Sequence, residues 1–275
     1  MPDYTEINGA YWDDRVSAHV ASPDYAVERF RDDPAFISDV VRFDRPRLGE
    51  LSGLDAVHLQ CHIGTDTISL GRLGARVTGV DLSEPALVEA RKLALAAGVD
   101  ARFVQSELYA APEALGGATF DLVYTGIGAL CWLPDIERWA DVVSSLLRPG
   151  GRLHIREGHP VLWSLSDARP DGLLVLDLPY FEQHEPVVWD EAGTYVATET
   201  VFTQNITNEW NHGLGEIVSA LLGHGMQLTM LEEHDSIPWE AFPGQMKEIG
   251  GGEYRIAERP ERLAHSYTLQ ALKVA

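Results

Sequence analysis

The sequence predicts an α/β fold: a doubly wound, mostly parallel seven-stranded sheet whose last strand is antiparallel. Short apolar runs alternate with helix-like stretches through the middle of the chain, which is the pattern of right-handed β-α-β units. Two further runs, 227–232 and 266–274, supply the final strands, and the last one is short and apolar enough to be an antiparallel addition. A polar start and an aromatic-rich interruption indicate an N-terminal helical cap and an insertion after strand five.

Residues 1–50 form the expected helical cap. They are polar, and Pro23, Pro34 and Pro46 divide them into short pieces. Aromatic side chains such as Trp12 are spaced along these pieces. The segment either covers the mouth of the neighbouring domain or packs on its outside, and in the first case Trp12 closes over a ligand as an aromatic lid suited to a cation.

Residues 51–275 form the expected main domain. Its first strands alternate with helices whose apolar residues recur at helical spacing. Ser83 is a plausible N-cap of the second helix, and Gly98 ends that helix. The strands are expected at 56–59, 76–80, 101–104, 120–124 and 152–155, and the helices at 65–73, 84–97, 135–147 and 213–222.

The stretch 158–211 interrupts this alternation. It is rich in aromatic residues, has a run of β propensity at 194–203, and contains the prolines Pro160, Pro170, Pro179 and Pro186. We expect an insertion on the substrate side of the sheet, because it falls between the fifth strand and the next helix.

Composition limits the classes of partner. The chain has 21 basic and 42 acidic residues and a formal charge of −21, without a cluster of Lys and Arg, so a nucleic-acid substrate is disfavoured. No apolar run reaches the roughly 18 residues of a membrane span, and the acidic N-terminus is unlike a signal peptide. Cys61 and Cys131 form no framework, which favours a reducing, cytoplasmic location. The ten histidines lack the spacing of a zinc motif, so no metal is expected.

Small and polar residues follow the expected strands where a ligand of an open α/β sheet binds. The run 57–64, V-H-L-Q-C-H-I-G, reads as a strand, a loop and a helix start, and Asp81 ends the second strand. Ser106, Glu107 and Leu108 follow the third strand, Thr125 opens the loop after the fourth, and the turn Leu147-Arg148-Pro149-Gly150-Gly151 precedes the fifth.

This series of motifs, from about Leu54 to Glu157, resembles the class I (Rossmann-like) S-adenosylmethionine-dependent methyltransferases that act on small molecules. The resemblance implies S-adenosyl-L-methionine as cofactor and S-adenosyl-L-homocysteine as product. It implies that Asp81 accepts the ribose hydroxyls and that a residue after the third strand reads the adenine edge. The implied cofactor-binding residues are Trp12, Gln60, His62, Gly64, Asp81, Leu82, Ser106, Glu107, Leu108 and Thr125.

The first motif departs from the family pattern, which has an acid followed by three glycines at alternate positions. Here these four positions hold His58, Gln60, His62 and Gly64. Either Gln60 and His62 contact the methionine part of the cofactor, or the loop has another shape. Asp66 either replaces the missing acid or is a favourable charge in a helix's first turn. A nicotinamide dinucleotide is disfavoured, because G-x-G-x-x-G is absent and its pyrophosphate needs that loop.

Methyl transfer is an in-line displacement at a carbon that a sulfonium has already activated, so the protein supplies alignment and excludes water. A base is needed only when the nucleophile arrives protonated. Glu157 and His159 are the best acid–base pair; the alternative is a hydrogen-bonded loop that ends the strand. His212 either reaches the substrate or, with Asn211, caps the next helix.

Tyr124 and Trp132 flank the transferred methyl group or pack in the core. The expected function is methyl transfer to an oxygen, nitrogen or carbon of a small-molecule acceptor, with the oligomeric state open. The alternative, suggested by the altered first motif, is a non-catalytic S-adenosylmethionine-binding or scaffold protein.

Overall fold

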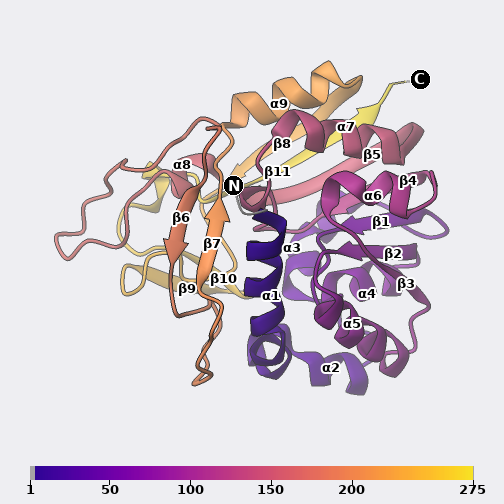
Figure 1. Cartoon of the computed structure of the whole chain (residues 1–275), viewed down its shortest axis with the longest axis horizontal. Helices are drawn as coiled ribbons and strands as arrows, with labels where there is room; N and C mark the ends of the chain where they lie inside the picture. Colours follow the sequence, from indigo (N-terminus) through magenta and orange to yellow (C-terminus); the bar gives the residue numbers. More distant parts are fainter. Residues whose placement is uncertain (1–3, 275) are drawn as a thin grey trace.

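A seven-stranded sheet forms the centre of the computed structural model, which describes residues 4–274 (Figure 1). The strand order is β3-β2-β1-β4-β5-β11-β8, and β1 to β5 are mutually parallel. The last strand, β11, is antiparallel to both of its neighbours, β5 and β8. The predicted fold class is therefore confirmed. The strands are β1 (Asp55–Leu59), β2 (Arg76–Asp81), β3 (Ala101–Gln105), β4 (Phe120–Thr125), β5 (Leu147–Gly158), β8 (Met226–His234) and β11 (Ser266–Lys273).

Helices cover both faces of this sheet and bury its apolar side chains. One face packs against α3, α4 and α5, and the other against α6, α7 and α9. Ser83 caps α5 by accepting a hydrogen bond from the Ala86 amide, as its position predicts. The helices are α3 (Asp39–Leu48), α4 (Thr65–Arg72), α5 (Glu84–Ala96), α6 (Ala111–Ala114), α7 (Ile136–Leu146) and α9 (Leu214–Gly223).

The N-terminal segment is helical, as predicted, and lies over the carboxyl ends of β1 and β2. It contains α1 (Tyr4–Ala21), the 3₁₀ turn η1 (Pro23–Tyr25) and α2 (Val27–Asp32) before α3. The Ser83 hydroxyl donates to Asp13 of α1 at 2.5 Å, and the Leu82 side chain packs beneath Gly9. Of the two expected placements, the structure shows a cap that covers the mouth of the sheet.

The insertion after β5 contains the short helix α8 (Pro160–Trp163) and a hairpin of β6 (Val187–Asp190) and β7 (Ile206–Glu209). The hairpin lies beside α1 in Figure 1, and Asn8 exchanges two hydrogen bonds with the backbone of Asn208. The run 194–203, singled out for β propensity, contains no strand. Its flanking backbone groups bind Asp14 and Arg15 of α1 instead of a neighbouring strand.

A second excursion, residues 235–265, separates β8 from β11 and was not predicted. It contains the hairpin of β9 (Met246–Gly250) and β10 (Glu253–Ile256), and its apolar side chains pack against α8. The buried Arg156 side chain of β5 forms two 2.8 Å hydrogen bonds with Glu253, which ties the excursion to the sheet. No helix of residues 4–274 has both the length and the apolar character to cross a membrane.

Candidate active site

The loop after β1 keeps a backbone shape that glycine favours, although only one glycine is present. Gln60, His62 and Gly64 have φ angles of 56°, 49° and 77°. The left-handed region costs an L-residue with a side chain roughly 1–2 kcal/mol, and such strain gathers at functional sites. The loop therefore has left-handed backbone at three alternate positions, Gln60, His62 and Gly64.

Gly64 is the one position of this loop where no side chain fits. A Cβ atom there would lie 2.9 Å from the Ala90 Cβ and 3.0 Å from the Phe103 ring. The contact brings the start of α4 against α5 and β3. The glycine thus fixes how closely the loop approaches the sheet.

Two buried polar atoms without partners face the point where the strand order reverses, between β1 and β4. Gln60 Nε2 donates to the Ala129 carbonyl at 2.9 Å, but its Oε1 is unpaired. Thr125 ends β4, pairs in register with Leu59, and its buried Oγ1 is also unpaired. Buried polar atoms in proteins nearly always have partners, so these two fit the polar groups of a ligand.

Asp81 ends β2 with its carboxylate beside the same loop. Oδ2 accepts a hydrogen bond from the His62 amide at 2.7 Å, and Oδ1 accepts one from the Ser83 amide at 2.9 Å. Each oxygen keeps a lone pair for a further donor, such as a hydroxyl. Burial raises the pKa of Asp81 to about 6, against the opposing effect of these amides.

The residues after β3 lie next to Asp81. The Ser106 amide donates to the Asp81 carbonyl at 2.9 Å, and the Ser106 hydroxyl donates to the Glu107 carbonyl at 2.7 Å. The Glu107 carboxylate accepts a bond from the Tyr109 amide and caps the 3₁₀ turn η2 (Leu108–Ala110), while Leu108 is buried in the core. The structure places all three of these predicted residues at this edge and engages the Glu107 carboxylate in its own turn.

Aromatic rings from four segments of the chain meet above the loop. The Trp12 ring lies 5.2 Å from His62 and 5.1 Å from Trp132, measured between centroids. His19 and Tyr195 join them from α1 and the insertion. We call Trp12, His19, Tyr25, His62, Trp132 and Tyr195 the aromatic cluster. Ring faces of this kind attract a cation.

Glu157, predicted as half of an acid–base pair, binds the loop after β4. Its two carboxylate oxygens accept hydrogen bonds from four backbone amides, those of Gly128, Ala129, Leu130 and Gly158, at 2.6–2.8 Å. Burial raises the pKa of Glu157, while these amides lower it. The carboxylate therefore fixes the loop that carries Trp132.

His159 does not hydrogen-bond to Glu157 in the part of the chain that the structure describes. Its Nδ1 accepts a bond from the Val161 amide and caps α8, and its Nε2 lies 3.0 Å from a Glu233 oxygen. Desolvation lowers the pKa of His159, and the Glu233 carboxylate opposes that shift. The two residues are neighbours in sequence that serve different parts of the fold.

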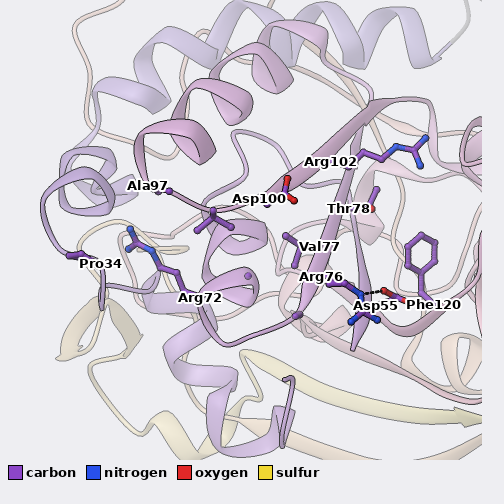
Figure 2. A pocket seen from close by; sticks show the side chains of 14 residues that line it. Pro34, Asp55, Arg72, Arg76, Val77, Thr78, Ala97, Asp100, Arg102 and Phe120 are labelled. Carbon is purple, nitrogen blue, oxygen red and sulfur yellow. Dashed lines mark hydrogen bonds and ion pairs between the residues drawn. The ribbon is translucent and has the colours of Figure 1, made fainter. Parts of the chain in front are cut away.

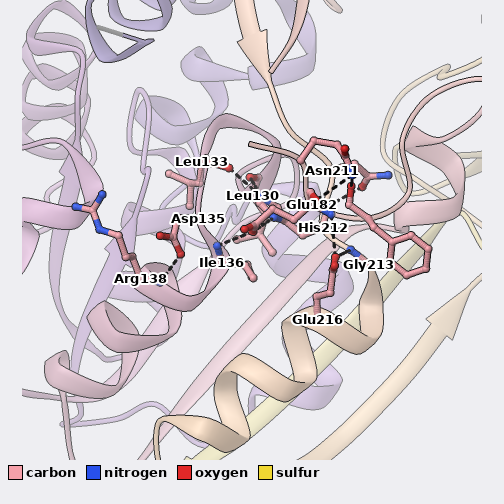
Figure 3. A network of polar contacts seen from close by, with 12 residues as sticks. Leu130, Leu133, Asp135, Ile136, Arg138, Glu182, Asn211, His212, Gly213 and Glu216 are labelled. Atoms are coloured by element: carbon pink, nitrogen blue, oxygen red, sulfur yellow. Dashed lines mark hydrogen bonds and ion pairs between the residues drawn. The ribbon is translucent and has the colours of Figure 1, made fainter. Parts of the chain in front are cut away.

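His212 lies at the centre of a buried polar network (Figure 3). Its Nδ1 is 2.8 Å from Glu182, and its Nε2 is 2.9 Å from the Leu133 carbonyl and 3.2 Å from that of Leu130. All of these neighbours accept hydrogen bonds, so the ring joins the insertion to the loop after β4. Asn211 does not cap α9: its amide donates to the carbonyls of Pro160 and Pro179.

Three further residues had alternative roles in the sequence, and the structure decides one of them. Tyr124 is fully buried and its hydroxyl donates to Asp44 at 2.7 Å, so it packs in the core. Trp132 is half-buried and belongs to the aromatic cluster. Asp66 lies under the site, where burial raises its pKa to about 6, and one carboxylate oxygen would be 3.3 Å from a Cβ placed on Gly126.

A pocket at the other end of the strands, away from the candidate site, contains none of these residues. Figure 2 shows it at the amino ends of the strands, where Arg76 is paired with Asp55 and Arg102 and Phe120 line the wall. Ligands of open α/β sheets bind at the carboxyl ends, so this pocket is not the candidate site. Within residues 4–274, no three His, Cys, Asp or Glu side chains gather as they would around a metal ion.

Part of the sequence is similar to methyltransferases, and the fold is similar to theirs over most of the chain. Residues 57–153 match the family described as a methyltransferase domain. The curated ubiquinone biosynthesis O-methyltransferase of Cronobacter sakazakii is 34% identical over 109 residues, which cover 39% of this chain and 43% of that protein. The enzyme of the same description from Xanthomonas euvesicatoria is 36% identical over 107 residues, covering 38% and 44%. The chain thus spans less than half the length of these relatives.

Solved structures extend the likeness of fold to most of the chain. An S-adenosylmethionine-dependent methyltransferase from Mesorhizobium loti has a TM-score of 0.56 at 22% identity, over 86% of this chain and 98% of that one. Magnesium protoporphyrin IX methyltransferase from Synechocystis, with bound S-adenosylhomocysteine, has a TM-score of 0.55 at 18% identity, over 98% of this chain and 100% of that one.

Sequence reasoning missed several residues that the fold brings to the site. His19 lies seven residues after Trp12 on one face of α1, a spacing that pointed to a shared role. Glu209 ends β7, where burial raises its pKa to about 7. Tyr195 comes from the middle of the insertion, and nothing in the local sequence predicts its contact with α1.

Proposed function

We propose that this protein transfers a methyl group from S-adenosylmethionine to a small-molecule acceptor by in-line displacement. The observation that carries the proposal is the set of groups at the carboxyl ends of β1, β2 and β4. These are the left-handed loop, the Asp81 carboxylate and the unpaired polar atoms of Gln60 and Thr125. Class I methyltransferases bind their cofactor at this point of the fold.

The residues present fit this cofactor. Asp81 has a free lone pair on each oxygen for the two ribose hydroxyls, and Ser106 stands next to it for the adenine edge. Gln60 Oε1 and Thr125 Oγ1 suit the charged groups of the methionine part. The aromatic cluster suits a sulfonium, because ring faces attract cations. When bound, the cofactor supplies an already activated methyl group.

The proposed acceptor is a small molecule with an apolar or aromatic body. The rings of Trp132 and Tyr195 both contact Trp12 beside the loop after β1, and such rings favour a planar apolar partner. The curated relatives are O-methyltransferases by description, which supports oxygen among the possible acceptor atoms. A charge of −21 argues against nucleic acid, and the unpaired Cys61 and Cys131 favour the cytoplasm.

We assign positioning roles to Glu157 and His212, because the chain itself binds their polar atoms. Both hold the loop 125–132, whose Trp132 belongs to the aromatic cluster. His159, which caps α8, is proposed to act on the insertion in the same way.

Calorimetric titration with S-adenosylhomocysteine tests the proposal. Micromolar binding by the wild-type protein, weakened at least tenfold in Asp81→Ala and unchanged in Asp100→Ala, would support it. Asp100 is exposed and lies away from the site, so it is a matched control. Absence of binding by the wild type would overturn the proposal. Binding without turnover on a broad set of phenols, amines and carboxylates would favour the scaffold alternative.

A further inference from the structure

Asp66 is a carboxylate at the candidate site that no basic side chain of residues 4–274 neutralises. It is half-buried in the first turn of α4, directly after the left-handed loop. Besides burial, the groups that act on its pKa are the Ser38 hydroxyl and the Asp44 carboxylate, and neither is a cation. A desolvated carboxylate without a counterion costs free energy, so such a residue at a strand end is a candidate for binding a ligand.

A glycine keeps the space beside this carboxylate open. Gly126 directly follows β4, at the point where the strand order reverses. A Cβ atom on Gly126 would lie 3.3 Å from Asp66 Oδ2 and 3.5 Å from His58 Nε2. The φ of Gly126 is outside the left-handed region, so the backbone itself does not require glycine here. What this glycine supplies is room between the Asp66 carboxylate and the end of β4.

His58 borders the same space and stands where the family has the acid of its first motif. Its Nδ1 lies 2.9 Å from Thr67 Oγ1, and burial lowers its pKa to about 3, so the ring is neutral near pH 7. A neutral ring neither supplies the missing negative charge nor repels a cation. The negative charge that the first motif lacks at position 58 is therefore present at Asp66, on the helix that follows the loop.

The polar groups at this strand end suit a zwitterion. Thr125 is fully buried, and its Oγ1 has no partner among residues 4–274. A hydroxyl can donate to a carboxylate, whereas an ionised Asp66 only accepts. Thr125 and Gly126 are consecutive at the end of β4, so this end offers a donor for an anionic group and an anionic acceptor for a cationic group.

We propose that Asp66 binds the primary ammonium of the methionine part of S-adenosylmethionine, and that Gly126 provides the space for that ammonium. This inference rests on the function proposed above and adds a residue for the amino-acid end of the cofactor. An ammonium has N–H donors and no acceptor, so it complements a carboxylate in both charge and hydrogen bonding. Hydrogen bonds between charged groups are roughly twice as strong as neutral ones, so Asp66 selects a ligand with a charged amino group.

The alternative role for Asp66 is a favourable charge at the start of α4, and the two roles predict different effects on stability. A carboxylate that serves the helix stabilises it, so its removal lowers the melting temperature. Burial instead raises the pKa of Asp66 to about 6, which means that folding disfavours its charged form, and at pH 8 this penalty is fully present. We therefore expect ligand-free Asp66→Asn to melt at or above the wild-type temperature at pH 8.

Calorimetric titration of the whole protein tests the assignment with two ligands. These are S-adenosylhomocysteine and its deamino analogue, 5′-(3-carboxypropyl)thio-5′-deoxyadenosine, which lacks only the ammonium. We expect the wild type to prefer S-adenosylhomocysteine by about tenfold or more. In Asp66→Asn the preference is expected to fall below about threefold, because affinity for the deamino analogue is unchanged or higher.

Two further variants support this comparison. Gly126→Ala places a methyl group beside Asp66 Oδ2 and is expected to weaken S-adenosylhomocysteine binding more than binding of the deamino analogue. Asp39→Asn removes a carboxylate from the first turn of α3, away from the site, and is the matched control that keeps the full preference. If Asp66→Asn does not fold, Gly126→Ala decides alone, and an unchanged preference in it overturns the inference.

The outcomes separate this inference from the proposed function. A preference that persists in Asp66→Asn, or a wild type that binds both ligands equally, overturns the assignment of the ammonium. A persistent preference together with a lower melting temperature would assign Asp66 to the helix start. In each of these cases retained S-adenosylhomocysteine binding leaves the methyltransferase proposal standing. Failure of the wild type to bind S-adenosylhomocysteine overturns both.

Discussion

Asp81 shows how one residue combines structural and ligand-binding demands. Its carboxylate holds the loop after β1 through the His62 amide and the start of α5 through the Ser83 amide. The same group is desolvated enough to have a pKa of about 6. The carboxylate is therefore protonated at a higher pH than an exposed aspartate would be. Any hydrogen-bond donor that approaches it, such as a ribose hydroxyl, favours the charged form.

This predicts that cofactor affinity depends on pH. Hydroxyl donors bind the ionised carboxylate, so below pH 6 the protonated Asp81 must lose its proton before binding. The affinity for S-adenosylhomocysteine is expected to fall as pH decreases below about 6, by up to about tenfold per unit. Titration calorimetry between pH 5 and 8 measures this. Asp81→Asn is expected to bind weakly at every pH, and a flat profile for the wild type would contradict the placement of the ribose.

Substituting Glu157 distinguishes a structural role of this carboxylate from a catalytic one, because the two roles predict different effects on stability. Replacing it with Gln puts an amide donor among four backbone donors, so buried N–H groups lose their acceptor. We expect Glu157→Gln to reduce the free energy of unfolding by about 3 kcal/mol or more, since each unsatisfied buried donor costs about 1–3 kcal/mol. Urea denaturation measures this, with Glu248→Gln at an exposed site as control. An unchanged stability with lost turnover would instead support Glu157 as a catalytic acid–base group.

At the scale of elements, α1 and the insertion act as one cover over the site. The buried Arg15 side chain donates to the carbonyls of Gly193 and Gln204, and Asp14 accepts from the amides of Thr203 and Gln204. These contacts hold the loop between β6 and β7 against the helix. We expect the cover to open when cofactor and acceptor enter, because its rings pack against the loop after β1.

Weakening this attachment is predicted to open the cover without unfolding the domain. Asp14→Ala removes the acceptor of two backbone amides that lie outside the sheet. We expect faster amide hydrogen exchange at 191–207, with the melting temperature lowered by less than about 3 °C, because this segment contributes little to the main core. Asp32→Ala, at the exposed end of α2, is the matched control. Unchanged exchange in Asp14→Ala would mean that the cover is held elsewhere.

The elements that sequence predicted well are those whose signal is local. Apolar runs bounded by Gly or a helix cap located β1 to β5, and Ser83 was identified as a cap from its position alone. The excursion 235–265 was missed, because its strands are short and largely exposed and are stabilised by packing on α8. The propensity of 194–203 for β structure was overridden by contacts with α1, which are 175 or more residues away in the chain.

The residues of the candidate site divide in the same way: those within one local motif were predicted, and those that only the fold brings together were not. Asp81, Gln60, His62 and Gly64 were named because one motif contains them, and their shared backbone shape appears only in three dimensions. His19 was missed because its partners His62 and Thr194 lie 43 and 175 residues further along the chain. The seven-residue spacing from Trp12 puts His19 on the same face of α1, but nothing in the local sequence identifies His62 and Thr194 as its partners.

At the scale of the whole molecule, the charge of −21 is the dominant electrostatic property. Acidic residues outnumber Lys and Arg by 42 to 21, so the negative charges are in twofold excess. Exposed pairs such as Arg91–Glu84 and Lys92–Glu89 do exist. Exposed pairs contribute about 0–1 kcal/mol each, and the excess of like charges acts against the compact state.

The sign of the salt dependence of stability follows from this balance. Salt weakens attractive pairs and repulsion alike, but the unpaired carboxylates are the larger group here. Raising NaCl from about 10 to about 200 mM shortens the Debye length from about 30 to about 7 Å, and we expect the melting temperature to rise by several degrees. Differential scanning calorimetry at pH 8 measures this, with sucrose of equal osmolality to separate screening from exclusion effects. A melting temperature that falls with salt would mean that the ion pairs, and not the excess negative charge, control stability.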